Sequence, residues 1–208
     1  METATRTPRL TLTMIDREDT KVAGFILRGL LASESLEQLQ VVKGRTGELT
    51  FADIAGKVSI KLLDQENVDE AVKMSAVYIA IASFENSVRE LISSHLLEEK
   101  GADWWNTCIS SDIRKRAEQK MKEEQQTRWH QARGLNPIYF TELKDLTSII
   151  QQNWTSFEAL LHDMDWVRHL LRTIERSRNV IMHSGQLAID DIERIGMNIR
   201  DWIRQVGG

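Results

Sequence analysis

The segment Arg178–His183, with the sequence RNVIMH, combines two side chains that can do phosphate and proton-transfer chemistry. A guanidinium group stays charged at any physiological pH and binds phosphate through a planar fork of donors. An imidazole titrates near neutrality and can therefore take up or release a proton. These are the two kinds of group with which a protein can cleave RNA without a metal ion. Asn179 directly follows the arginine and adds an amide that can orient either group or the phosphate.

The segment lies at the end of a pattern that predicts an amphipathic helix from about residue 163 to residue 184, stopped by Gly185. The apolar positions of this helix are Val167, Leu170, Leu171 and Ile174. On an ideal helix Asn179 and His183 share a face, whereas Arg178 and His183 lie about 140° apart. One chain therefore does not bring Arg178 and His183 together by itself, and the spacing favours a site that a second protomer completes.

Three arginines precede the segment on the same predicted helix: Arg168, Arg172 and Arg176. They continue the face that carries Asn179 and His183, because residues three or four positions apart are neighbours on a helix. This positive strip predicts a path for an RNA backbone, since phosphate contacts supply much of the affinity for nucleic acid. A purely structural interpretation also stands. Arginines at such steps are typical of a solvated helix face, and the helix dipole stabilises a histidine in the last turn.

The composition is that of an ordinary globular protein with a small negative charge. The chain has 208 residues, 41% of them hydrophobic and 28% charged, and a formal net charge of −4. No overall basic field is present, so any nucleic-acid site must be local. The single cysteine, Cys108, excludes an internal disulfide. With no secretory signal and no apolar run of about 20 residues, we expect a cytoplasmic protein that does not enter a membrane.

The apolar spacing predicts an all-α protein in two parts. Residues 67–208 have the pattern of an antiparallel helical bundle with short connections, and prolines are almost absent. Residues 1–66 form an N-terminal extension of unknown role. Within it, residues 21–42 have helical spacing, and residues 51–63 fit either a short helix or a strand.

Several helices of the bundle are predicted individually. The first runs from 68 to about 100 and is ended by Gly101, with an apolar face at Val72, Ala76, Ile79, Ser83, Val88, Leu91 and Ile92. A highly charged helix over 113–131 has little apolar content and is interpreted as a solvated or partner-facing arm. Another helix is predicted to be capped by Thr141. The last helix has an apolar face at Ile192, Ile195, Ile199, Trp202 and Ile203.

Three stretches together resemble the HEPN superfamily of small helical bundles, over residues 70–206. They are Arg178–His183 followed by a last amphipathic helix, Tyr139–Trp154, and Phe84–Ile92 with its glutamate and following arginine. The branch that the chain resembles occurs beside or fused to ATPases and helicases in prokaryotic defence systems, and in transcript-surveillance endonucleases.

The resemblance implies a metal-independent endoribonuclease that works as a homodimer and needs no cofactor. His183 would act as general base on a ribose 2′-hydroxyl or as acid on the leaving oxygen, and Arg178 would hold the scissile phosphate. Asn179 would orient one of these groups. The resemblance also implies that Glu85 positions Arg178 or His183. The alternative is that Glu85 is a surface residue paired with Arg89 at i+4.

A chain of this kind would act in a defence or toxin–antitoxin system, with RNA as substrate and an antitoxin or an ATPase or helicase as partner protein. Superfamily toxins that are silenced by tyrosine modification carry a tyrosine where this chain has Gly185, so we do not expect that control here. The alternative from another class is a non-catalytic adaptor that keeps the bundle and docks a larger ATPase or nuclease. The four remaining histidines show no spacing typical of a metal site.

Overall fold

The computed structural model describes residues 49–207 except 128, 130 and 132, and these residues form helices and loops without any β-strand. The chain divides into two units, residues 1–62 and 63–208. In the described part of the first unit, α2 (Phe51–Lys57) is followed by the 3-10 turn η1 (Ile60–Leu62). The predicted helical segment at 21–42 lies outside the described residues.

Residues 51–57, which the sequence left open between helix and strand, are helical because of a reciprocal cap at their start. The Thr50 hydroxyl accepts a hydrogen bond from the Asp53 backbone N–H at 3.2 Å, and the Asp53 carboxylate accepts from the Thr50 N–H at 2.9 Å. This capping box satisfies two backbone donors that a helix start otherwise leaves unpaired.

The second unit is a helical bundle, which confirms the predicted all-α class for the described part of the chain. Its elements are α3 (Gln65–Lys100), α4 (Trp104–Cys108), α5 (Ser111–Gln126), η2 (Pro137–Phe140), α6 (Leu143–Gln152), α7 (Trp154–Leu161), α8 (Met164–Met182) and α9 (Ile189–Val206). The division that the sequence suggested between residues 66 and 67 falls in the first turn of α3. None of the described helices combines the length and the apolar character that crossing a bilayer requires.

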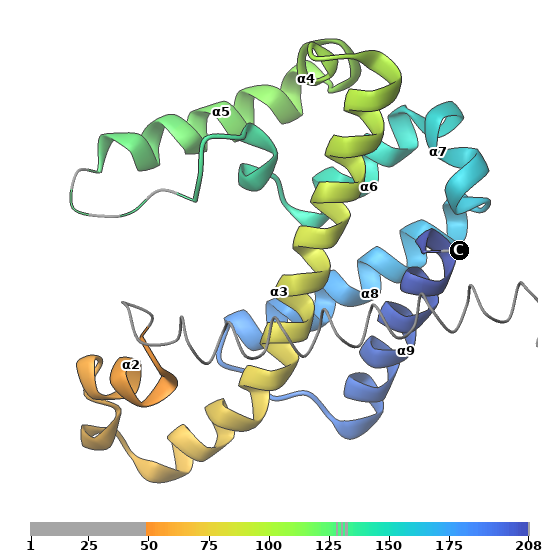
Figure 1. The fold of residues 1–208 in the computed structure, drawn as a ribbon. Helices are drawn as coiled ribbons and strands as arrows, with labels where there is room; N and C mark the ends of the chain where they lie inside the picture. Colours follow the sequence, from red (N-terminus) through yellow and green to blue (C-terminus); the bar gives the residue numbers. More distant parts are fainter. Residues whose placement is uncertain (1–48, 128, 130, 132, 208) are drawn as a thin grey trace, which may run out of the picture. The chain divides into compact units, whose positions relative to one another are not determined.

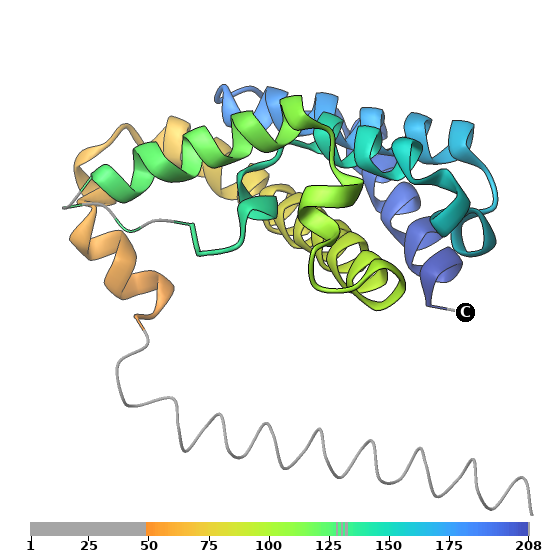
Figure 2. The same cartoon turned by 90° about the horizontal axis from the view of Figure 1, so that it is seen from above.

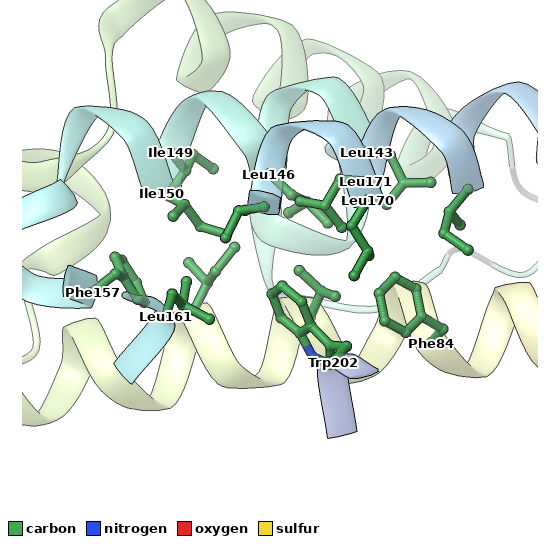
Figure 3. Close-up of a cluster of buried hydrophobic side chains, with 14 of the residues drawn as sticks. Phe84, Leu143, Leu146, Ile149, Ile150, Phe157, Leu161, Leu170, Leu171 and Trp202 are labelled. Atoms are coloured by element: carbon green, nitrogen blue, oxygen red, sulfur yellow. The ribbon is translucent and has the colours of Figure 1, made fainter. Parts of the chain in front are cut away.

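The bundle has two layers around one core. Figures 1 and 2 show α6 and α8 side by side on one side, with the long α3 and α9 on the other. Side chains of α6 and α8 point toward Phe84 of α3 and Trp202 of α9 (Figure 3). The Trp202 ring meets Phe84 edge-on, with centroids 5.6 Å apart, and stacks on Trp166 at 6.1 Å. Each such side chain, when fully buried, contributes about 1.5–3 kcal/mol to stability.

The predicted core positions of α8 are confirmed, whereas the predicted face of α3 is partly wrong. Val167, Leu170, Leu171 and Ile174 are all buried. On α3, Val72 is 50% exposed and Ile79 is 62% exposed. The buried α3 residues are Val77, Ile81, Phe84, Glu85, Val88, Arg89, Ile92 and Leu96. The charged residues Glu85 and Arg89 lie within the buried face of α3, and the first three turns of the helix bury no side chain. The apolar positions alone therefore predicted the wrong buried face. On α9, Ile203 is likewise exposed, at 59%.

The charged helix α5 is shorter than predicted and is attached to the bundle along one face. It ends at Gln126, and the backbone N–H of the C-cap residue Thr127 donates to the Glu124 carbonyl at 3.1 Å. Ile113 and Ala117 are buried. The helix is therefore not a free arm.

Two ion pairs tie α5 to the start of α6. Arg116 pairs with the buried carboxylate of Asp145 at 2.6 Å, and Lys120 pairs with Glu142 at 2.7 Å. Glu142, not the predicted Thr141, is the N-cap residue of α6. The Thr141 hydroxyl instead donates to the Ile138 carbonyl at 2.6 Å and so belongs to the preceding turn.

The Glu142 ion pairs predict a pH-dependent contribution to stability. Hydrogen bonds from Lys120 and then Lys144 lower the pKa of Glu142 from 4.5 to about 2. A lowered folded-state pKa stabilises the protein above about pH 4.5, and this contribution is lost as the pH falls toward about 2. Its carboxylate is 41% exposed, so solvent screening limits the contribution to less than about 1 kcal/mol.

We therefore expect Glu142→Gln to lower the free energy of unfolding in urea at neutral pH, with the difference from wild type shrinking as the pH approaches 2. Glu98→Gln, at an exposed position of α3 without an ion pair among the described residues, is the matched control. A Glu142→Gln effect that persists unchanged at low pH would contradict the assignment.

Candidate functional site

Helix α8 carries the RNVIMH segment in its last turns. The helix begins at a cap in which the Asp163 carboxylate accepts hydrogen bonds from the backbone N–H groups of Asp165 and Trp166, at 2.8 and 3.1 Å. It ends at Met182, with His183 as the C-cap residue. Arg178 lies at the border of the buried stripe, and its side chain is 37% exposed.

Arg178 is held by a buried carboxylate on another helix. Its Nε lies 3.2 Å from Oε2 of Glu85, a residue of α3 that is only 6% exposed. The other oxygen of Glu85 accepts a short hydrogen bond from Arg89, one turn further along α3. A buried carboxylate is stable only when paired, so Glu85 fixes the position of both guanidinium groups.

Arg89 is itself almost fully buried, at 8% exposure. Its guanidinium donates to the Thr141 carbonyl and to Oδ1 of Asn86, each at 2.9 Å. Its Nε is buried without a partner among the described residues. The cluster of Glu85, Arg89 and Arg178 therefore joins α3, α8 and the turn before α6, and it carries one more positive than negative charge.

The two interpretations of Glu85 from the sequence both describe part of its environment. It pairs with Arg89 at i+4, and it also contacts Arg178 on the motif helix. It is not a surface residue, so that part of the alternative is wrong. The buried role of Arg89 was missed. The signal was present, because Glu85 and Arg89 lie four and eight positions after the apolar Ile81, and residues four apart share a face of a helix.

A cavity of about 430 Å³ opens beside this cluster. It is lined from α3, α8 and the segment 133–139, chiefly by Tyr78, Asn86, Arg89, Arg133, Tyr139 and Arg178. Because Glu85 engages Arg178 through Nε, the two terminal nitrogens of Arg178 keep their donors, and no described residue binds them. The cavity thus offers Arg178 to an anion from solvent.

His183 and Asn179 do not line this cavity and lie on the exposed face of α8. Arg172 and Arg176 are exposed on the same face, and the described residues offer none of these four side chains a hydrogen bond or ion pair. Arg168 differs, because it pairs with Asp165 one turn earlier. The structure therefore separates Arg178 from His183 within one chain, as their spacing predicted.

The end of α8 holds the backbone of His183 in a Schellman motif. The N–H of Gly185 donates to the Val180 carbonyl at 2.8 Å, and the N–H of Ser184 donates to the Ile181 carbonyl at 3.0 Å. Ser184 has a φ of 61°, a left-handed conformation that usually requires glycine. A Cβ on Gly185 would lie 2.7 Å from Cγ1 and 2.9 Å from the carbonyl oxygen of Val180, so a larger residue would force this helix end to shift.

Within the described residues, no three His, Cys, Asp or Glu side chains come together to hold a metal ion. No family model matches the chain, and no curated protein or solved structure matches it either.

The buried cluster predicts a large and specific stability effect. We expect Glu85→Ala to lower the free energy of unfolding by about 3–5 kcal/mol, because it leaves the buried charge of Arg89 without its carboxylate. Glu90→Ala, at an exposed position of the same helix, should change it by less than about 0.5 kcal/mol. Chemical denaturation of both variants measures the difference, and equal effects would show that the cluster does not stabilise the fold.

The helix end predicts two neighbouring substitutions of opposite sign. Ser184→Gly should raise the free energy of unfolding by about 1 kcal/mol, since glycine adopts a positive φ without strain. Gly185→Ala should lower it by about 1–3 kcal/mol, because the new methyl group overlaps Val180. Thermal unfolding followed by circular dichroism tests both, and a stabilising Gly185→Ala would exclude this geometry.

Proposed function

We propose that this chain is a metal-independent endoribonuclease whose site is completed by a second copy, with Arg178 from one protomer and His183 from the other. The observation that carries the proposal is the arrangement around α8. Arg178 is anchored by its Nε and keeps free donors in a cavity, whereas His183 stands exposed and unpaired on another face of the same helix.

The residue types provide a complete reaction. His183 takes the proton from a ribose 2′-hydroxyl, and the 2′-oxygen attacks the adjacent phosphorus. The bond from phosphorus to the 5′-oxygen breaks, and that oxygen leaves with a proton from a general acid, a role that His183 also fits. Arg178 binds the phosphate and stabilises the charge that develops on it. The products are a 2′,3′-cyclic phosphate and a 5′-hydroxyl.

The remaining polar groups of α8 support the same assignment. Asn179 lies beside His183 and can orient it or the phosphate through its amide. Arg172 and Arg176 extend the exposed face and offer local positive charge in a chain of net charge −4. Arg168 adds less, because Asp165 already neutralises it. In a defence or toxin–antitoxin setting, an antitoxin or an ATPase or helicase would keep this activity in check.

A non-catalytic adaptor is the second candidate, and the surface of α3 favours it. Val72, Tyr78 and Ile79 are between 47% and 62% exposed in the first half of that helix. Apolar side chains gathered at the surface are typical of a site that docks another protein. In this case the chain would bind a larger ATPase or nuclease and would cleave no RNA.

A mixing experiment tests the composite site. Wild type, Arg178→Ala and His183→Ala are incubated with total RNA and a tRNA pool in EDTA, and the two variants are also co-expressed. Each variant alone should be inactive. The co-expressed pair should recover about a quarter of wild-type cleavage, because half of its dimers are mixed and each mixed dimer has one intact site of two.

If each protomer held its own complete site, co-expression of the two inactive variants would restore no cleavage. That result would overturn the composite site. Absence of cleavage by dimeric wild-type protein would favour the adaptor. Arg204→Ala, in the last turn of α9 and 78% exposed, is the control and should cleave like wild type.

A further inference from the structure

The cavity beside Arg178 contains groups that the cleavage reaction does not use. Arg133, Tyr139, Tyr78 and Asn86 line it together with Arg178 and Arg89. Arg133 comes from the segment between α5 and η2, far from α8 in the sequence. Its presence in the same cavity therefore results from the fold and not from the motif.

Arg133 is also paired with a glutamate through its Nε, with its side chain 55% exposed and that of Glu124 27% exposed. Its Nε pairs with Oε1 of Glu124 at 2.7 Å, and its backbone N–H donates to the other oxygen of that carboxylate at 3.3 Å. The guanidinium lies over the Phe140 ring, 5.5 Å from its centroid. Its terminal nitrogens have no partner among the described residues. Two guanidinium groups thus reach one cavity already oriented, which reduces the entropy that binding an anion would cost.

The charge of the lining selects an anion. Three guanidinium groups, those of Arg89, Arg133 and Arg178, line the cavity with one carboxylate, that of Glu85. When the Glu124 carboxylate that pairs with Arg133 is counted as well, one positive charge is left over. Arginine donors in a planar fork match the oxygens of a phosphate. A phosphate held between Arg133 and Arg178 would balance the excess positive charge.

The rest of the lining suits a flat aromatic group. Tyr78 is 47% exposed and offers its ring, and Tyr139 offers a second, partly buried ring. Aromatic side chains stack on nucleic-acid bases with little preference among them. Asn86 uses its oxygen to accept from Arg89, so its NH₂ group remains available to a base edge. A volume of about 430 Å³ lies within the range of small-ligand sites.

From these contacts we infer that the cavity is a nucleotide subsite, in which Arg133 and Arg178 hold a phosphate and the tyrosines stack on the attached base. The inference rests on the proposed function, since it assigns the nucleotide to the RNA strand whose scissile phosphate Arg178 binds. A free nucleotide presents the same phosphate and base as a nucleotide of an RNA strand. The test therefore compares binding of a strand with binding of a free nucleotide.

The test measures binding of the full chain to a fluorescent RNA made resistant to cleavage by 2′-O-methylation. Arg133→Gln should weaken binding about tenfold or more, the loss expected for a charged hydrogen-bonding group. Arg204→Gln removes the same charge from α9 and should change binding less than about twofold. Tyr78→Ala should weaken binding of the RNA while leaving the competition by inorganic phosphate unchanged.

Three results would overturn the inference: equal binding by Arg133→Gln and Arg204→Gln, inorganic phosphate competing as well as RNA, or a free nucleoside monophosphate binding as tightly as the strand. Cleavage of unmodified RNA by the same variants separates this inference from the proposed function. If Arg133→Gln cleaves unmodified RNA as fast as wild type does, the nucleotide subsite is excluded and the nuclease proposal stands. If RNA binding depends on Arg133 but wild-type protein cleaves no RNA, the subsite is supported and the nuclease proposal is excluded.

Discussion

The arrangement of the site depends on one buried carboxylate. Glu85 lies among apolar side chains of α3, where an unpaired charge would cost several kcal/mol. Two guanidinium groups satisfy it, Arg89 from the same helix and Arg178 from α8. Arg89 then reaches the Thr141 carbonyl, so the turn before α6 is tied to the same point. Core packing brings these elements together, and the ion cluster fixes where Arg178 lies between them.

The position of Arg178 also determines the direction in which the side chains of Asn179 and His183 point. With Arg178 turned toward α3, helical periodicity carries Asn179 and His183 away from the cavity and onto the exposed face. The Schellman motif at Ser184 and Gly185 ends the helix directly after His183, so no later turn brings the imidazole back. The guanidinium of Arg178 and the imidazole of His183 are thereby held on different faces of α8, and in the proposed composite site a second molecule would bring them together.

The sequence predicted the elements that follow simple apolar periodicity and failed where charge interrupts it. The four apolar positions of α8 are all buried, because nothing polar breaks their spacing. The face of α3 was misjudged because Glu85 and Arg89 occupy it. Thr141 was assigned as a cap, but its hydroxyl bonds to the preceding turn. The cavity was not predictable, because Arg133 and Arg178 are 45 positions apart and meet through tertiary packing.

The choice of arginine at these positions separates a structural from a functional interpretation. A lysine carries its three donors on a single nitrogen, so a glutamate and a second anion would have to crowd around one point charge. An arginine can bind a carboxylate through Nε and still present two terminal nitrogens to a second anion. Arg178 and Arg133 are both held in this manner, each by a glutamate from a different helix, and both keep those nitrogens in one cavity. An ion pair that only stabilises the fold needs no second set of donors, whereas the proposed phosphate site does.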